Sequence, residues 1–366
     1  MESFSLFFVY FMSLILGLVI GSFLNVVIFR TEKDMTFGGR SFCPKCKKKI
    51  VWYDNIPLLS FLWLGGRCRH CKKKIHWSYP AVEMATSLLF LLSAFLVMSG
   101  GLNGFLSHYG TVAGLLELFN QPPTLVNLHR LSFITTLIEL VFLWSVFATA
   151  FAVFVYDLKY MLIPDSFTWM AIKIVAVFNI VSDSLLMVSV FSNKNQDLLM
   201  SVAGFANEKI VLGFTWLSDF FGLEEKNFLD KIIYLKSLSG RYESTVVEGS
   251  MLQNYFIDSS VGKFINFILE TRTGSGLIVG LILALIFFAI VYFSNETWMG
   301  MGDVKLVFFI GFFLGMIKGW LAIFLAFELG AIFGITLIII GRAKMKTALP
   351  FGPFLIAGML LALFIH

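Results

Sequence analysis

Residues 274–294 read GSGLIVGLILALIFFAIVYFS, a run of 21 positions without a charged side chain. A helix of that length spans about 30 Å, the thickness of the hydrocarbon core of a membrane. Similar runs recur along the 366 residues, of which 58% are hydrophobic and 14% charged. The sequence therefore predicts an all-α polytopic membrane protein with about eight transmembrane helices, at 5–29, 81–99, 131–156, 165–187, 274–294, 304–317, 320–341 and 350–365.

The charged residues between the spans indicate their orientation. Residues 30–78 hold twelve lysines and arginines against three acidic residues. Such an excess is typical of a cytoplasmic loop, whereas residues 188–273 show no such excess and are expected outside. With eight spans, residues 157–164 and 295–303 also face the cytoplasm. The net charge of +5 thus reflects topology, and a nucleic-acid partner is not expected.

These patterns divide the chain into five parts. We expect a first transmembrane helix at 1–29 and a small cytoplasmic domain at 30–80. Further transmembrane helices follow at 81–187, then a large extracytoplasmic insertion at 188–273 and a last group of transmembrane helices at 274–366. The lipid bilayer is the expected partner of the spans. The chain shows no internal repeat.

All four cysteines lie in the cytoplasmic part, as two Cys-x-x-Cys hooks: Cys43 with Cys46, and Cys68 with Cys71. Two hooks at this separation predict a tetrahedral zinc site, which is structural because four protein ligands leave no open position. Reduced hooks without metal, or two disulfides, are the alternatives, and a cytoplasmic location disfavours disulfides. His70 is a less favoured replacement ligand.

Two aspartates at the cytoplasmic ends of spans are the candidate catalytic groups. Asp157 ends the third span, and Asp303 opens the sixth within GMGD, residues 300–303. Carboxylates at such positions are costly and often functional. If the two converge they share a proton, so that one acts as base on a water while the other donates to a carbonyl oxygen, as in aspartic proteases. Simple ion pairs with Lys159 or Lys305 are the alternative.

In their order along the chain these motifs resemble those of the type IV prepilin peptidases, polytopic aspartic proteases that also act as N-methyltransferases. The resemblance rests on Asp157 with Pro164 and Asp165, and on the segments GSFLNVVIFR (21–30), DNIPLLS (54–60), GGRC (65–68), YPAVE (79–83), GMGDVKL (300–306) and PFGPF (350–354).

The resemblance implies roles for particular residues. Asp157 and Asp303 would be the catalytic aspartates, and the residues that support their motifs would be Gly300, Gly302, Lys305, Pro164 and Asp165. The implied substrate is a prepilin or pseudopilin, cut just before its hydrophobic helix at the cytoplasmic face of the inner membrane. The new amino terminus would be methylated from S-adenosylmethionine, whose binding residues the sequence does not indicate.

Two other classes of protein share some of these features. A presenilin-like protease also uses a GxGD aspartate, but it lacks paired cysteine hooks. A non-enzymatic proton-coupled transporter would place its carboxylates near the middle of the membrane, among broken helices. Because both aspartates are expected at a membrane face, the sequence favours the prepilin peptidase. The long insertion, residues 188–273, departs from the short connection that the resemblance implies, and it could dock a partner.

Replacing residues 195–265 with a short flexible linker is expected to leave prepilin cleavage largely intact. The segment contains no cysteine, and the spans on either side are expected to pack as neighbours, so that closing the shorter loop costs little. Gel mobility of a prepilin incubated with the solubilised variant measures cleavage. Loss of cleavage in a variant that still inserts and retains its metal would contradict the peripheral role of the insertion.

Overall fold

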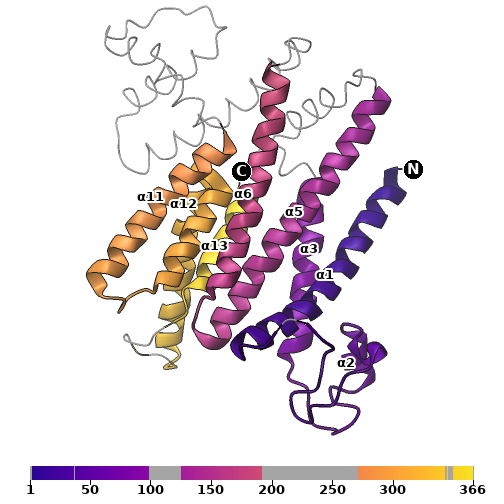
Figure 1. The fold of residues 1–366 in the computed structure, drawn as a ribbon. Coiled ribbons are helices and arrows are strands. Elements are labelled where there is room, and N and C mark those ends of the chain that lie inside the picture. Colours follow the sequence, from indigo (N-terminus) through magenta and orange to yellow (C-terminus); the bar gives the residue numbers. More distant parts are fainter. Residues whose placement is uncertain are drawn as a thin grey trace, which may run out of the picture.

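The structure, a computed structural model, describes residues 2–36, 38–98, 125–191, 271–342, 344 and 349–365 (Figure 1). Within these ranges it contains helices and no strand. Apart from their ends, the predicted insertion at 188–273 and the predicted outer loop at 100–130 lie outside the described residues.

Six helices are long and apolar enough to cross a membrane, which confirms the all-α membrane fold. They are α1 (Glu2–Glu32), α3 (Ser78–Met98), α5 (Leu125–Tyr160), α6 (Asp165–Phe191), α11 (Arg272–Ser294) and α12 (Met301–Ile339). A shorter apolar helix, α13 (Gly352–Phe364), follows them. Two small elements, the 3-10 helix η1 (Trp52–Asn55) and α2 (Leu59–Trp63), lie in the segment between α1 and α3.

Helix α12 contains two of the predicted spans because it turns back at Gly315. A straight helix of its 39 residues would be about 58 Å long, nearly twice the membrane core. Gly315 has φ 73° and ψ −164°, values outside the helical region. A Cβ added to Gly319 would lie 3.4 Å from the Cα of Gly311, although residues eight apart on a straight helix are separated by about 12 Å. The predicted spans 304–317 and 320–341 are thus two legs of one hairpin.

The segments that carry the sequence motifs meet at one end of the bundle, which we call the motif end. It comprises residues 30–80, 157–165, 295–303 and 349–352, and it lies at the bottom of Figure 1. The orientation argument from lysine and arginine also places these segments on a common side of the membrane. The topology therefore brings distant motifs together, as the predicted alternation of spans requires.

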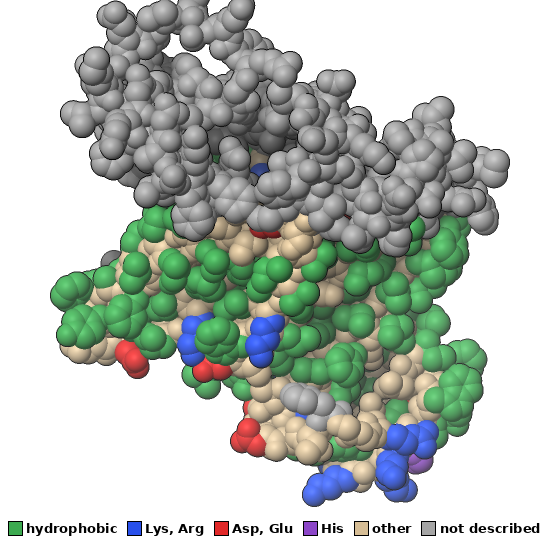
Figure 2. All heavy atoms as spheres, turned by 45° about the horizontal axis from the view of Figure 1, so that its top comes forward, with side chains coloured by type: hydrophobic (Ala, Val, Ile, Leu, Met, Phe, Trp, Pro, Cys, Tyr) green, Lys and Arg blue, Asp and Glu red, His purple; other side chains and the backbone are tan. Residues whose placement is uncertain are grey.

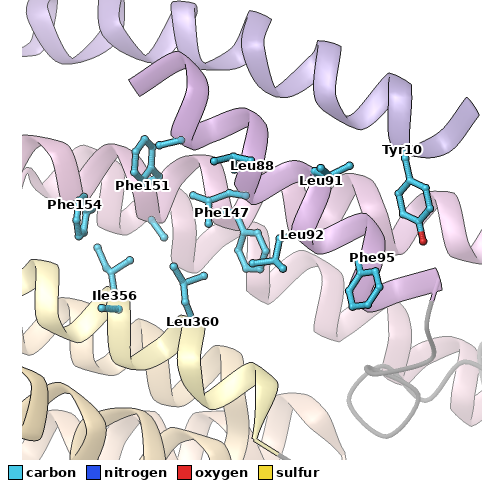
Figure 3. Close-up of a pocket in the computed structure, with 14 residues that line it drawn as sticks. Tyr10, Leu88, Leu91, Leu92, Phe95, Phe147, Phe151, Phe154, Ile356 and Leu360 are labelled. Carbon is cyan, nitrogen blue, oxygen red and sulfur yellow. The ribbon is translucent and has the colours of Figure 1, made fainter. Parts of the chain in front are cut away.

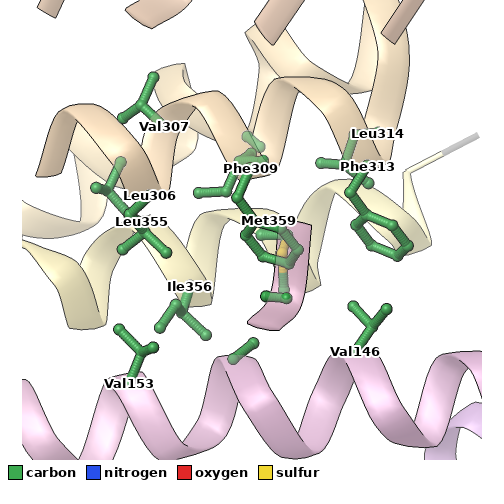
Figure 4. Close-up of a cluster of buried hydrophobic side chains, with 14 of the residues drawn as sticks. Val146, Val153, Leu306, Val307, Phe309, Phe313, Leu314, Leu355, Ile356 and Met359 are labelled. Carbon is green, nitrogen blue, oxygen red and sulfur yellow. The ribbon is translucent and has the colours of Figure 1, made fainter. Parts of the chain in front are cut away.

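The core of the bundle lies between α5, α13 and the first leg of α12 (Figure 4). Val146 of α5, Phe309 of α12 and Met359 of α13 are all at most 1% exposed. Small residues allow these helices to approach closely, as is common in membranes. A Cβ on Gly358 of α13, for example, would lie only 2.3 Å from the backbone oxygen of Ala322 on α12.

Helices α6 and α11, which flank the predicted insertion, pack against each other as expected. Asp183 of α6 holds the beginning of α11. Its carboxylate oxygens accept hydrogen bonds from the amides of Arg272 at 3.1 Å and Thr273 at 2.9 Å. The two ends of the insertion are therefore fixed next to each other by the bundle.

The change Gly358→Ala is expected to destabilise the bundle by about 1–3 kcal/mol, because the new methyl group meets backbone that can move only with its helix. Thermal unfolding in detergent, followed by tryptophan fluorescence, measures the loss. Gly334→Ala on α12 is the matched control, since its Cβ would lie 3.6 Å from the nearest atom, an ordinary contact. Equal melting temperatures for the two variants would contradict the close approach of α13 to α12.

Candidate active site and metal centre

Asp157 lies in the last turn of α5 and is only 4% exposed. Its Oδ2 accepts a hydrogen bond of 3.0 Å from the amide of Gly352, the first residue of α13. The chain leaves α5 through a tight turn, in which Met161 has a φ of 53°. The carbonyl of Pro164 then accepts a hydrogen bond of 3.2 Å from the amide of Phe167, at the start of α6. The end of α5 is thus fixed on both sides, which holds Asp157 at the motif end.

Gly352 is a site residue that the sequence analysis did not single out, although it lies within the PFGPF motif. A Cβ at this position would lie 2.6 Å from Oδ2 of Asp157, closer than two such atoms can approach. Any other residue would therefore push the carboxylate away from the amide that binds it. The signal was present in the sequence: a glycine between Pro350 and Pro353 marks a backbone with a special requirement.

Asp303 lies in the first turn of α12 and is half-buried. Its Oδ2 accepts a hydrogen bond of 3.2 Å from the amide of Gly300. This bond fixes the side chain at the start of the helix. Ile163 connects this helix start with the surroundings of Asp157, because a Cβ on Gly302 would lie 2.8 Å from its Cβ and a Cβ on Gly352 would lie 3.3 Å from its Cδ1. The structure thus brings together the two aspartates that the sequence marks as candidate catalytic groups, although they belong to helices far apart in the chain.

The two glycines of the GMGD motif have different surroundings. A Cβ on Gly302 would lie 2.8 Å from Cβ of Ile163, so this glycine lets α12 pack against the turn between α5 and α6. A Cβ on Gly300 would meet nothing closer than 4.0 Å. Gly302 therefore serves the packing that positions Asp303, whereas Gly300 borders open space.

Lys305 forms an ion pair with Asp165, with 2.6 Å between Nζ and Oδ1. The pair joins the start of α12 to the start of α6, at side chains that are 28% and 63% exposed. Lys159 instead lies over the ring of Tyr160, with Nζ 4.9 Å from the centroid. In the described part of the chain, neither lysine forms an ion pair with Asp157 or Asp303, contrary to the alternative reading of the two aspartates as simple ion-pair partners.

The four cysteines converge below α1 and α3. The sulfur atoms of Cys43, Cys46, Cys68 and Cys71 all lie within 4.8 Å of one another, and those of Cys43 and Cys71 are 4.0 Å apart. Sulfurs at the corners of a tetrahedral zinc site are about 3.8 Å apart, because each zinc–sulfur bond is about 2.3 Å. A disulfide would need about 2.05 Å, and all four cysteines are free. The donor set therefore fits a metal ion, as predicted.

The two hooks are copies of each other, so the prediction of no internal repeat was wrong. Residues 43–50 and 68–75 share the pattern Cys-x-x-Cys-Lys-Lys-Lys-Ile. The amide of Cys43 donates to the carbonyl of Lys48, and that of Cys68 to the carbonyl of Lys73, both at 3.0 Å. Each copy is only eight residues long, within a chain dominated by apolar spans.

The thiols have conflicting tendencies to ionise. The amide of Cys71 and, to a smaller extent, that of His70 lower the pKa of the Cys68 thiol to about 7 against the effect of burial. The amide of Lys48 lowers the pKa of the Cys46 thiol, but burial and the neighbouring thiols together outweigh it and raise that pKa to about 11. Four thiolates cannot lie side by side without a cation. A divalent metal would remove this conflict by binding all four in ionised form.

The segment with the hooks is attached to the bundle by buried polar groups. The guanidinium of Arg30, at the end of α1, donates to backbone carbonyls between residues 36 and 40, the shortest bond being 2.6 Å to Gly38. The carboxylate of Glu83 on α3 accepts a hydrogen bond of 2.9 Å from the amide of Leu58. Figure 2 shows basic side chains gathered on this segment, at one end of the molecule. The predicted basic character of residues 30–78 is therefore concentrated around the four cysteines.

Residues 15–97 match the family model described as the Bacterial Peptidase A24 N-terminal domain. This segment runs from the second half of α1 through the cysteine hooks to α3. The resemblance to the prepilin peptidases is thereby confirmed in this part of the chain. Asp157 and Asp303 lie beyond it, so their assignment stays a prediction.

Curated relatives agree with the family model. The prepilin leader peptidase/N-methyltransferase of Vibrio cholerae is 49% identical over 80 residues, 19% of this chain and 32% of that protein. The Myxococcus xanthus protein of the same name is 53% identical over 77 residues, 21% of this chain and 23% of its own length. The type 4 prepilin-like proteins leader peptide-processing enzyme of Escherichia coli is 46% identical over 97 residues, which are 21% of this chain and 36% of that protein. The chain thus spans less than half the length of these relatives, and no solved structure matches it.

Changing Cys43 and Cys46 together to serine is expected to abolish metal binding and to open residues 40–75 to proteases. In zinc-finger peptides, the binding of structural zinc contributes an apparent free energy on the order of 10–16 kcal/mol to folding. The segment with the hooks would lose a contribution of this kind. Elemental analysis and limited proteolysis measure the two effects, with the exposed Lys45→Ser as control in the same hook. A freshly purified, reduced wild-type protein without metal would contradict the site.

Proposed function

We propose that this protein is a membrane aspartic endopeptidase that removes the leader of type IV prepilins or pseudopilins. The observation that carries the proposal is that Asp157 and Asp303, whose carboxylates accept hydrogen bonds from the amides of Gly352 and Gly300, lie at the motif end on segments that both adjoin Ile163. The names of the relatives, which refer to prepilin processing, supply the substrate class.

The two aspartates can divide one proton between them. The ionised carboxylate accepts a proton from a water molecule while the water oxygen attacks the carbonyl carbon of the scissile peptide bond. The protonated carboxyl group donates its proton to the carbonyl oxygen. When the tetrahedral intermediate collapses, the carbon–nitrogen bond breaks and a proton passes to the leaving amine. The amides of Gly352 and Gly300 orient the carboxylates, and the open space at Gly300 admits the substrate backbone.

The location of the reaction follows from charge. The motif end carries the lysine-rich hooks, and an excess of lysine and arginine indicates the cytoplasmic side of an inner membrane. A prepilin whose basic leader remains in the cytoplasm would therefore present its cleavage site at the level of the two aspartates. On the opposite side we assign the insertion, residues 188–273, to docking of an extracytoplasmic partner.

A second activity is N-methylation of the new amino terminus from S-adenosylmethionine. It is supported by the names of the relatives in Vibrio cholerae and Myxococcus xanthus, which include N-methyltransferase. The segment with the four cysteines matches the same family and lies at the motif end, where the new amino terminus would appear. In this proposal Zn²⁺ has a structural role, because its four thiolates leave no position for a substrate.

The two alternative classes are less consistent with these observations. A presenilin-like GxGD protease offers no explanation for the four converging cysteines or for the relatives. A proton-coupled transporter would place its carboxylates near the middle of the membrane, whereas Asp157 and Asp303 lie at helix ends.

Asp157→Asn and Asp303→Asn are each expected to reduce prepilin cleavage by at least about 10³-fold, because an amide can neither accept the proton of water nor share one with its partner. Asp165→Asn should have a smaller effect, since its carboxylate pairs with Lys305 rather than with the substrate. Mass spectrometry of the prepilin product reports cleavage and methylation in one measurement.

Asp34→Asn is the matched control for these variants. Asp34 is exposed at the motif end, and its φ of 51° is one that asparagine adopts readily. It should retain full activity. Near wild-type cleavage by either Asp157→Asn or Asp303→Asn, in protein that is inserted and folded, would show that the dyad is wrongly assigned.

A further inference from the structure

A groove of about 800 Å³ opens between α3, α5 and α13 (Figure 3). Its lining side chains are apolar except for that of Tyr10, which comes from α1. Along α3 it extends from Ala85 to Phe95, a distance of about 15 Å in a helix. Leu88 and Phe95 are 59% and 55% exposed, so the groove opens on the outer surface of the bundle, where lipid surrounds the helices.

One end of the groove lies next to the proposed catalytic dyad. On α5 the lining residue Phe154 precedes Asp157 by three positions, and on α13 the lining residue Ile356 follows Gly352 by four. Both separations are about one helical turn. Gly352 and Asp157 are hydrogen-bonded to each other, so the two walls of the groove converge on that contact. An apolar segment in the groove would therefore end beside Asp157.

The lining has the composition of a helix-binding surface. Each of the three helices contributes one alanine to it, Ala85, Ala150 and Ala357. Small residues let a further helix approach closely in a membrane, and the phenylalanines between them supply side-chain contacts. A lipid acyl chain is thin and flexible, and it needs no such small residues.

We propose that this groove binds the apolar helix of the membrane-embedded substrate and thereby places the peptide bond just before that helix at Asp157 and Asp303. This inference rests on the proposed function and adds the subsite that selects the substrate. The substrate enters sideways from the bilayer, its helix packs along α3, α5 and α13, and the position of the helix in the groove determines which bond is cut.

Filling the groove tests this subsite. Ala85→Trp and Ala357→Trp should each lower kcat/KM for a full-length prepilin by at least tenfold. They should leave cleavage of a soluble peptide, which contains the leader and cleavage site but not the helix, unchanged. Ala331→Trp is the control, because Ala331 is exposed on α12 outside the groove. Unaltered cleavage of the full-length prepilin by both filled variants would overturn the proposal, as would an equal loss on both substrates in folded protein.

Cross-linking tests the same site without requiring activity. In the Asp303→Asn variant, a photoreactive phenylalanine analogue replaces Leu92, which lies inside the groove. As a control, the analogue replaces Ile335, which is 58% exposed on α12. In vesicles containing prepilin, the probe at position 92 should attach to the apolar helix of prepilin and the probe at 335 should not. Adducts with lipid alone at position 92 would overturn the proposal. A wild-type protein that cleaves neither substrate would refute the proposed function, while the cross-link still decides what the groove binds.

Discussion

The hydrogen bond between the carboxylate of Asp157 and the amide of Gly352 joins residues 195 positions apart, and the site depends on it. A carboxylate that is almost fully buried needs a donor, since an unpaired one would be very costly in this environment. The donor is a backbone amide at the start of α13, so the interaction fixes α13 relative to α5. Glycine at position 352 is the condition for this contact, because any side chain would fill the place of the carboxylate oxygen.

The hairpin in α12 completes the arrangement. Its first leg begins at Asp303, and its second leg returns the chain to the motif end before α13 starts. Because Gly315 lets the chain reverse, both Asp303 and Gly352 reach the same end as Asp157. A straight α12 would have left them on opposite sides of a membrane. Close packing of α13 against α12 then keeps the three elements in a fixed relation.

The sequence predicted much of this, because its strongest signals are local. Apolar runs located the helices, and the lysine and arginine bias placed the motifs on one side. The spacing of the hooks identified the four ligands, whose sulfur atoms do converge. Contacts between distant segments could not be read in the same way. The partner of Asp157, the packing of Gly302 against Ile163 and the pairing of Lys305 with Asp165 depend on how helices are placed in space.

The segment that carries the hooks has almost no apolar interior. Of residues 38–77, only Cys43 is buried, with 8% of its surface exposed, so the cluster of thiols occupies the place that a hydrophobic core takes in other small domains. The helix bundle, by contrast, contributes none of the sulfur ligands and has its own core. The two parts of the chain thus rest on different interactions. A metal bound by the thiols would order the peripheral segment without changing the packing of the bundle, so that removing it would unfold one part and leave the other intact.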